Sequence, residues 1–504
     1  PLDKPAITMR DLGLLKMACE SYLGSLGVDQ RTARRAFHLA VIAQREFKQA
    51  VRREGAAIIR SARAEGRPMA LLLSRPYHID PQIHHKAPDI LNDFGVDVLT
   101  EDSVPLEDNP KLANKHVVSL WQYPNRNLYA ANWACRQPDV EVVQINSFGC
   151  GPDAIAVDEA RRTLNEWKKG FTVIRVDEIE STGSMRLRLR SMVESMRRKA
   201  QSDPSYTPRR TTQDFQKADR ERIILVPDFA RFATLPIARP MMDMGFKIEV
   251  LPPADRQSVD IGLKYTNNEI CYPAIVIIGD VIKALQSGMY DPREVAVGIS
   301  QTGGQCRDSC YLTLLKHGLV AAGFDQVPVI SVATNFKPLN DQPGAKVNYP
   351  EFIYKILQTM TYADSVSAMY HACAVREENP GSALKLANTF MDALKDMNLK
   401  IRPGDLQSML KQAVRAFNAV PVRESSYPAV GIVGEIYVKL NTFGGGGVVP
   451  WLIDQGIEVI LPPLTEYFTS NFVNWDIDLK KHLLRPDWIW ALSRLIERPM
   501  ENYI

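Results

Sequence analysis

Short apolar runs recur along the chain, and longer stretches in which apolar residues have helical spacing separate them. The runs form two series, at residues 69–73, 96–99, 141–145 and 172–176, and then at 223–227, 248–251, 295–299 and 327–330. Strands rich in apolar residues are typically buried on both faces, and their alternation with helices is typical of βαβ units around a parallel sheet. We therefore predict an α/β protein with two doubly wound parallel-sheet domains.

The length of 504 residues is enough for about three domains. Apolar spacing near 3.6 residues predicts a helical N-terminal segment, and a polar stretch with Pro204 and Pro208 is typical of a linker. Strand signals are rare between the second series and a later pair of runs at 430–434 and 459–461. The predicted parts are a helical N-terminal segment at 1–66, α/β domain 1 at 67–200, a linker at 201–220, α/β domain 2 at 221–345, a helical insertion at 346–425, and a return to α/β domain 2 with a C-terminal tail at 426–504.

Composition excludes several classes of protein. Hydrophobic residues make up 45% and charged residues 24%, as in ordinary globular proteins, and the net charge of +3 argues against nucleic-acid binding. No apolar run approaches the roughly 20 residues that a membrane span needs. The seven scattered cysteines favour a reducing, cytoplasmic location. The chain starts without Met or an apolar leader, as expected for a processed chain or a piece of a longer one.

Three cysteines lie in turns that are rich in glycine, proline or asparagine, where a strand or loop leads into a helix. Cys150 is flanked by Gly149 and Gly151, Cys271 precedes Tyr-Pro, and Cys306 follows the run 295–299. Ligands of open parallel sheets bind at the carboxyl ends of strands, and a helix N-terminus lowers the pKa of a thiol. These residues are therefore candidate metal ligands or nucleophiles.

Three thiolates from three turns of two domains are the donor set that an iron–sulfur cluster in an interdomain cleft needs. A zinc ion is an alternative, although the paired CxxC motifs of structural zinc sites are absent from the sequence. Three unrelated buried thiols are the remaining interpretation.

Several neighbours of these turns are further candidates. We assign Gly149, Gly303 and Gly304 to cofactor binding, because glycine lets backbone approach a ligand closely. Arg307 follows Cys306 and is placed to bind cluster sulfide or balance its charge. His78 follows the first run and is a candidate proton donor to a reduced substrate, with a structural role as the alternative.

Seven motifs occur in one order along the chain: RPYHIDP at 75–81, LTEDS at 99–103, SFGCGPD at 147–153, GLKY at 262–265, NNEICYP at 267–273, QTGG at 301–304 and VGEIYVK at 433–439. Over about residues 68–465 the sequence resembles the C-terminal half of the large activase-related proteins associated with 2-hydroxyacyl-CoA dehydratases. Its second α/β part also resembles the dehydratase subunits and the double-cubane cluster proteins.

This resemblance implies an oxygen-sensitive iron–sulfur cluster with Cys150, Cys271 and Cys306 as ligands, in an anaerobic system. It also implies a partner ATPase that delivers an electron at low potential, reduction or radical dehydration at the cluster, and assembly as a homodimer or larger complex. The chain has no GxxxxGK[ST] phosphate loop, so we expect ATP hydrolysis to belong to a separate iron–sulfur activase.

Three further cysteines, Cys135, Cys310 and Cys373, lie where the related proteins are not expected to carry cysteine. Together with the motif cysteines they make six thiolates, the number that a double-cubane [8Fe-9S] cluster needs. A single [4Fe-4S] cluster with an open or non-protein fourth site is the alternative.

The predicted function is that of an enzyme, the cluster-bearing component of an ATP-dependent low-potential reductase or dehydratase system that acts on a small molecule or an acyl-CoA. The alternative is a non-catalytic electron-relay or scaffold subunit that passes electrons to a separate 2-hydroxyacyl-CoA dehydratase. A zinc-bound structural module is the third possibility.

Overall fold

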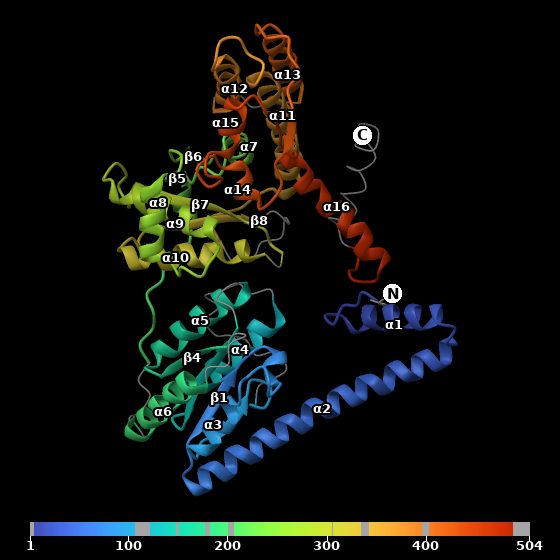
Figure 1. The fold of residues 1–504 in the computed structure, drawn as a ribbon, viewed down its shortest axis with the longest axis vertical. Coiled ribbons are helices and arrows are strands. Elements are labelled where there is room, and N and C mark those ends of the chain that lie inside the picture. The colour runs from blue at the N-terminus through green and yellow to red at the C-terminus, as the bar shows by residue number, and fades with distance from the viewer. Residues whose placement is uncertain are drawn as a thin grey trace. The chain divides into compact units, whose positions relative to one another are not determined.

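The structure is a computed structural model that describes residues 5–105, 121–147, 151–176, 182–199, 206–304, 306–333, 342–395 and 403–486 (Figure 1). The chain divides into two compact units. The first contains Pro1–Ala57 and Thr465–Ile504, and the second contains Ile58–Leu464. The two four-stranded parallel sheets lie in the second unit, and the α/β class predicted from the apolar runs is confirmed.

The first sheet has four parallel strands in the order β2-β1-β3-β4. Every residue of β1 is buried, because this strand lies inside the sheet with helices on both faces. The strand order reverses between β1 and β3, which places a ligand-binding edge at the carboxyl ends of these two strands. The strands are β1 (Met69–Leu73), β2 (Asp97–Thr100), β3 (Val140–Asn146) and β4 (Phe171–Arg175).

Alternate residues of β1 supply two separate cores. Met69, Leu71 and Leu73 pack on one face with α4 and α5, whereas Ala70 and Leu72 pack on the other with α3 and α6. This alternation follows from the two-residue period of a strand. The covering helices are α3 (Ala87–Asp93), α4 (Gln122–Ala134), α5 (Pro152–Glu166) and α6 (Thr182–Lys199).

The second sheet repeats this arrangement in the order β6-β5-β7-β8, again all parallel. Its strands are β5 (Ile223–Val226), β6 (Lys247–Val250), β7 (Val295–Gln301) and β8 (Val329–Ala333). One face is covered by α9 and α10, whose apolar residues share a core with β5, β7 and β8. The nearby helices are α7 (Thr234–Asp243), α8 (Arg256–Tyr265), α9 (Tyr272–Gln286) and α10 (Tyr311–Ala322), together with the short helix η3 (Arg307–Cys310).

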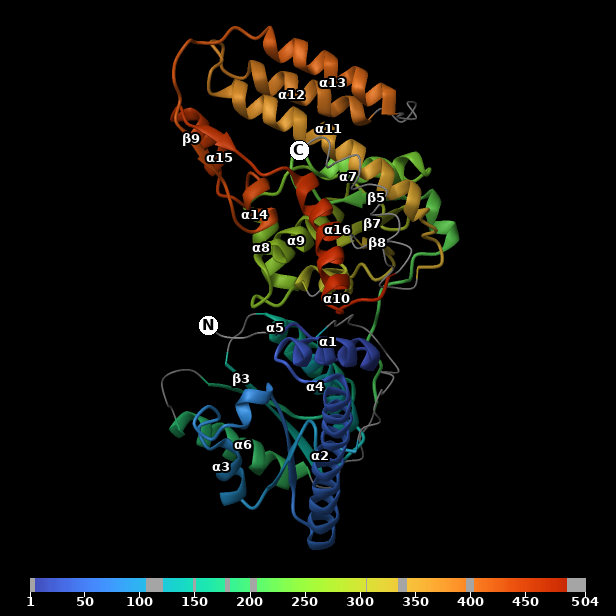
Figure 2. The ribbon, with the colours of Figure 1, turned by 90° about the vertical axis from the view of Figure 1, so that its right-hand side faces the viewer.

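Three helices with a common core follow the second sheet (Figure 2). They are α11 (Tyr349–Ala374), α12 (Ser382–Asp392) and α13 (Pro403–Asn418). After them come β9 (Ala429–Gly431), α14 (Ile436–Leu440), α15 (Val448–Asp454) and β10 (Glu458–Ile460).

The pair β9 and β10 differs from the expected return to the second sheet. These strands pair in parallel with each other and form a separate two-stranded sheet. Each has three residues, and β9 is exposed along its whole length, so this pair does not enlarge the buried sheet.

The first unit contains α1 (Leu12–Ser25) and most of α2 (Gln30–Glu65), as the helical N-terminal pattern predicts, together with nearly all of α16 (Leu464–Lys480). Asp11 caps α1 by accepting backbone N–H bonds from Gly13 and Leu14, and its carboxylate also accepts two hydrogen bonds from Arg485. Among the helices that are described, none is long and apolar enough to cross a membrane.

Candidate functional site

Two predicted ligands, Cys271 and Cys306, stand at helix starts in the second sheet domain. Cys271 is the N-cap of α9, and its carbonyl accepts hydrogen bonds from the N–H groups of Ala274 and Ile275. Cys306 is the N-cap of η3, immediately after β7 and its glycine turn. The Cys271 thiol is partly exposed and the Cys306 thiol is exposed, so both are accessible to a ligand.

The two thiols lie within electrostatic reach of each other. Burial raises the pKa of Cys271, and negative charge on Cys306 raises it as well. Two groups lower the pKa: the Tyr311 hydroxyl, which hydrogen-bonds the sulfur, and the positively charged Arg307. The net pKa of Cys271 stays above its ordinary value, so Tyr311 and Arg307 offset only part of the effect of burial on this thiol. Arg307 is among the residues predicted from sequence, whereas Tyr311 is not. The available signal for Tyr311 was its position five residues after Cys306, in the adjoining helix.

The turn between β7 and η3 is held by the buried Ser309. Its hydroxyl donates a 2.8 Å hydrogen bond to the carbonyl oxygen of Gly304 and lies 3.0 Å from the hydroxyl of Thr302. Its backbone carbonyl oxygen accepts a 2.6 Å hydrogen bond from the side-chain amide of Gln301. Gly303 has φ +72°, which favours glycine, and no atom lies within 4 Å of a Cβ built on Gly304. Among the described residues, the space around the backbone of Gly304 is therefore open.

Asp308, in the same turn, is a titratable group that the sequence analysis did not single out. Its pKa is raised to about 7, mainly by burial and to a smaller extent by the nearby Glu435 carboxylate, although a backbone hydrogen bond from Thr302 lowers it. Its carboxyl group can thus hold or release a proton near neutral pH beside the thiols.

Cys150 and Gly149 lie outside the described residues, but the helix that follows them, α5, lies against the loop that carries Cys271. Ala154 and Ile155, in the first turn of α5, belong to the same apolar core as Ile270 and Cys310. The Asn267 amide also donates a 2.9 Å hydrogen bond to the Ala154 carbonyl oxygen. The start of α5 therefore contacts the loop that carries Cys271.

The three additional cysteines lie in three different cores. Cys310 is buried beside Cys271 and Cys306, and burial raises its pKa to about 12. Cys135 is buried under the first sheet, where burial also raises its pKa to about 12, and Cys373 lies in the core of the three-helix region. The structure brings Cys310 to the predicted ligands and keeps Cys135 and Cys373 apart from them.

His78 lies at the carboxyl edge of the first sheet and is fully buried. Its Nδ1 accepts the backbone N–H of Arg75 at 3.1 Å, so Nε2 carries the proton toward the Ser147 hydroxyl at 2.7 Å. Burial lowers the pKa of this histidine to about 4. Its role as a proton donor remains a prediction, and Ser147 is the hydroxyl group that its Nε2 contacts.

Other polar residues gather at the same edge. Arg75 binds Asp153 of α5 at 2.8 Å, and Arg126 of α4 binds the buried Glu101 at 3.2 Å. Burial raises the pKa of Glu101 to about 7, although Arg126 opposes the shift. The sequence analysis did not predict these ion pairs, because they join segments far apart in the chain.

An iron–sulfur cluster, which the resemblance implies, fits the donor set in part. Cys271 and Cys306 supply two thiols with an adjacent cation and a hydrogen bond to sulfur, as such clusters use. Within the described ranges, no group of three or more His, Cys, Asp or Glu side chains is arranged to hold a metal ion. Cys150, the third predicted ligand, lies outside these ranges.

Comparison with known proteins gives one match. Residues 1–104 match a family described as the CoA enzyme activase uncharacterised domain (DUF2229). This match overlaps the resemblance only at its start and adds the N-terminal helices, which the resemblance did not include. No curated protein and no solved structure matches the chain. The chain is thus associated with CoA enzyme activase systems through its N-terminal part.

Proposed function

We propose that this chain is the cluster-bearing component of an ATP-dependent low-potential reductase or dehydratase system. A separate iron–sulfur ATPase would supply its electrons, and a small molecule or an acyl-CoA would be the substrate. The observation that carries the proposal is the meeting of the Cys271 loop, the Cys306 turn and the start of α5 in one place. A bound cluster would supply one-electron chemistry at low potential.

The chain's own residues have defined tasks in this proposal. Cys271, Cys306 and, through its link to α5, Cys150 would hold the cluster. The Tyr311 hydroxyl and the Arg307 guanidinium would stabilise negative charge on sulfur, and the turn at Gly303 and Gly304 would leave room for the inorganic group.

The positions of the other cysteines favour a single [4Fe-4S] cluster over a double cubane. A double cubane would need six thiolates at one centre, whereas Cys135 and Cys373 are buried in separate apolar cores. Buried cysteines of this kind commonly pack as small apolar residues of a core.

Anaerobic purification with iron and acid-labile sulfide measured per chain tests the proposal. We expect Cys150→Ser, Cys271→Ser and Cys306→Ser each to lose most of the iron, and Cys135→Ala and Cys373→Ala to retain it. Far-UV circular dichroism identifies any variant that has not folded. Full iron in all three serine variants would falsify the ligand assignment, and loss of iron in both alanine variants would favour the six-thiolate cluster.

A second function, that of an electron relay to a separate dehydratase, is favoured by one observation. The Cys306 thiol is exposed, so a group bound there would lie near a surface that a partner could reach. The two functions differ in turnover. With activase, ATP and reductant, the enzyme converts substrate on its own, whereas the relay needs a third protein.

A further inference from the structure

A cavity of about 430 Å³ lies in the C-terminal part of the second unit. Its walls come from residues 230–233, helix α11, the segment from α14 to α15, and β10 with the residues that follow it. The volume lies within the range of about 300–1,000 Å³ that is typical of small-molecule sites. Among the described residues that line the cavity there is no cysteine, so it is distinct from the site of Cys271 and Cys306.

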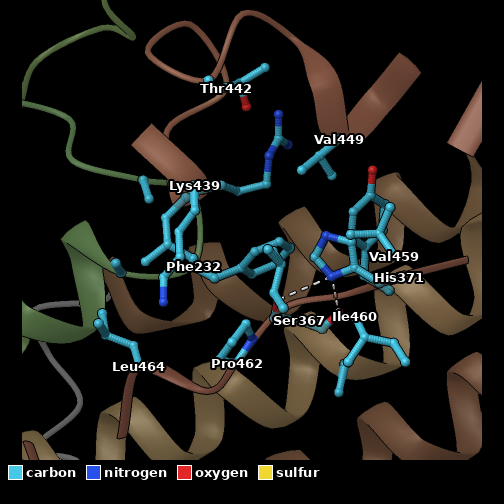
Figure 3. Close-up of a pocket in the computed structure, with 18 of the residues that line it drawn as sticks. Phe232, Ser367, His371, Lys439, Thr442, Val449, Val459, Ile460, Pro462 and Leu464 are labelled. Atoms are coloured by element: carbon cyan, nitrogen blue, oxygen red, sulfur yellow. Dashed lines mark hydrogen bonds between the residues drawn. The ribbon is translucent and has the colours of Figure 1, made fainter. Parts of the chain in front are cut away.

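Most of the cavity wall is apolar (Figure 3). Phe232 contributes an aromatic face, and Val449, Val459, Ile460 and Leu464 contribute aliphatic groups. Such walls favour a ligand with a hydrocarbon body, because burial of apolar surface is favourable at about 25 cal/mol per Å².

His371 places a hydrogen-bond acceptor in this apolar cavity. The residue is only 5% exposed, and its Nδ1 lies 2.7 Å from the Ser367 carbonyl oxygen, so Nδ1 carries the proton. Its Nε2 has no hydrogen-bond partner in the part of the chain that the structure describes, and Figure 3 shows this nitrogen on the ring edge that faces the cavity. Phe232 and Tyr370 both contact the ring in edge-on geometry and hold its orientation.

The charged groups in the lining leave an excess of positive charge. Glu458 is paired with Arg376 at 2.5 Å, and Asp364 accepts the backbone N–H of Leu464 at 2.9 Å. Lys439 also lines the cavity and makes no ion pair with any described residue. Arg231 contributes a second cation, which donates a hydrogen bond to the neutral Asn388.

We propose that this cavity binds a small free organic acid with an apolar body and a hydroxyl or N–H group on that body. Lys439 binds the carboxylate, the apolar walls enclose the hydrocarbon, and the donor group of the ligand bonds Nε2 of His371. This site is independent of the thiol site and of any bound cluster.

Calorimetric titration of the full chain with three probes tests the site. The probes are hexanoate, its uncharged methyl ester and 3-hydroxyhexanoate. We expect hexanoate to bind about tenfold more tightly than the ester, because a hydrogen bond to a charged group contributes about 1.5–3 kcal/mol. We expect the hydroxyl group to strengthen binding a further threefold or more.

Two variants separate these contributions. Lys439→Met should abolish the preference for hexanoate over the ester, and His371→Phe should abolish the gain from the hydroxyl group. Lys411→Met, on an exposed position of α13, is the matched control for loss of a lysine and should bind like the unaltered chain. Absence of saturable hexanoate binding, or equal binding by Lys439→Met and the unaltered chain, overturns the proposal.

Discussion

At the residue scale, the Tyr311 hydroxyl offsets part of the effect of burial on the pKa of the Cys271 thiol. Because its hydrogen bond lowers the pKa of the thiol, Tyr311→Phe should leave less thiolate at pH 8. We expect alkylation of Cys271 by iodoacetamide, followed by peptide mass spectrometry on metal-free reduced protein, to slow about threefold or more. Tyr265→Phe removes an exposed hydroxyl from α8 and should leave the rate unchanged. An unchanged rate in Tyr311→Phe would show that the hydroxyl does not act on this sulfur.

A second residue-scale prediction concerns His78 and pH. Its pKa is about 4 in the folded chain against an ordinary value of 6.5, so the unfolded chain binds a proton more readily between these values. Its stabilising contribution is therefore complete above about pH 6.5 and is lost as the pH falls toward 4. At pH 5 the loss should be about 2 kcal/mol.

Urea unfolding at pH 7.5 and pH 5 measures this loss. The difference in unfolding free energy between the unaltered chain and His78→Gln should shrink at pH 5, because the glutamine variant cannot take up this proton. A constant difference would contradict the assignment of a neutral, buried imidazole.

At the element scale, the close contact of α8 and α9 positions the Cys271 turn. A Cβ on Gly279 would lie 1.7 Å from the carbonyl oxygen of Ser258, so the helices can pack this closely only with glycine there. We expect Gly279→Ala to separate the helices, to cost about 3 kcal/mol or more by thermal or urea unfolding, and to lower the iron content.

Gly404→Ala is the matched control for this change. No atom of the described residues lies within 4 Å of a Cβ at Gly404, which is in helix α13, so alanine should leave stability unchanged or raise it by up to about 1 kcal/mol. Equal effects of the two substitutions would mean that the α8–α9 contact does not limit this part of the fold.

At the scale of the whole molecule, Arg209 attaches the segment between the two sheet domains to α5. Its guanidinium binds Glu159 at 2.9 Å and also binds Glu166, and both carboxylates are buried. Arg209→Met would leave two buried carboxylates without a cation, which should cost about 3–5 kcal/mol and speed proteolysis of the segment.

The neighbouring Arg210 provides the control. It pairs with Asp325 at 2.6 Å, but its side chain is 66% exposed, so Arg210→Met should cost less than about 1 kcal/mol in urea unfolding. A similar loss in both variants would show that burial of the ion pair is not the deciding factor.

The sequence predicted those features that depend on neighbours in the chain. The run 69–73 is β1, and the runs 141–145 and 295–299 lie within β3 and β7, because short segments that are mostly apolar and bounded by turn residues favour a buried strand. The glycine turn before Cys306 and the Pro that follows Cys271 likewise mark helix starts that the structure contains.

Tertiary structure alone decided which side chains meet. Cysteine is equally suited to a core and to a site, so the pattern could not show that Cys135 and Cys373 lie in separate cores while Cys310 lies beside Cys271. The cavity around His371 and Lys439 joins segments some seventy residues apart, and β9 pairs with β10 instead of the large sheet. The local spacing of apolar residues determines where strands and helices begin. Contacts between distant segments depend on how layers of strands and helices pack together, and no short stretch of sequence encodes that packing.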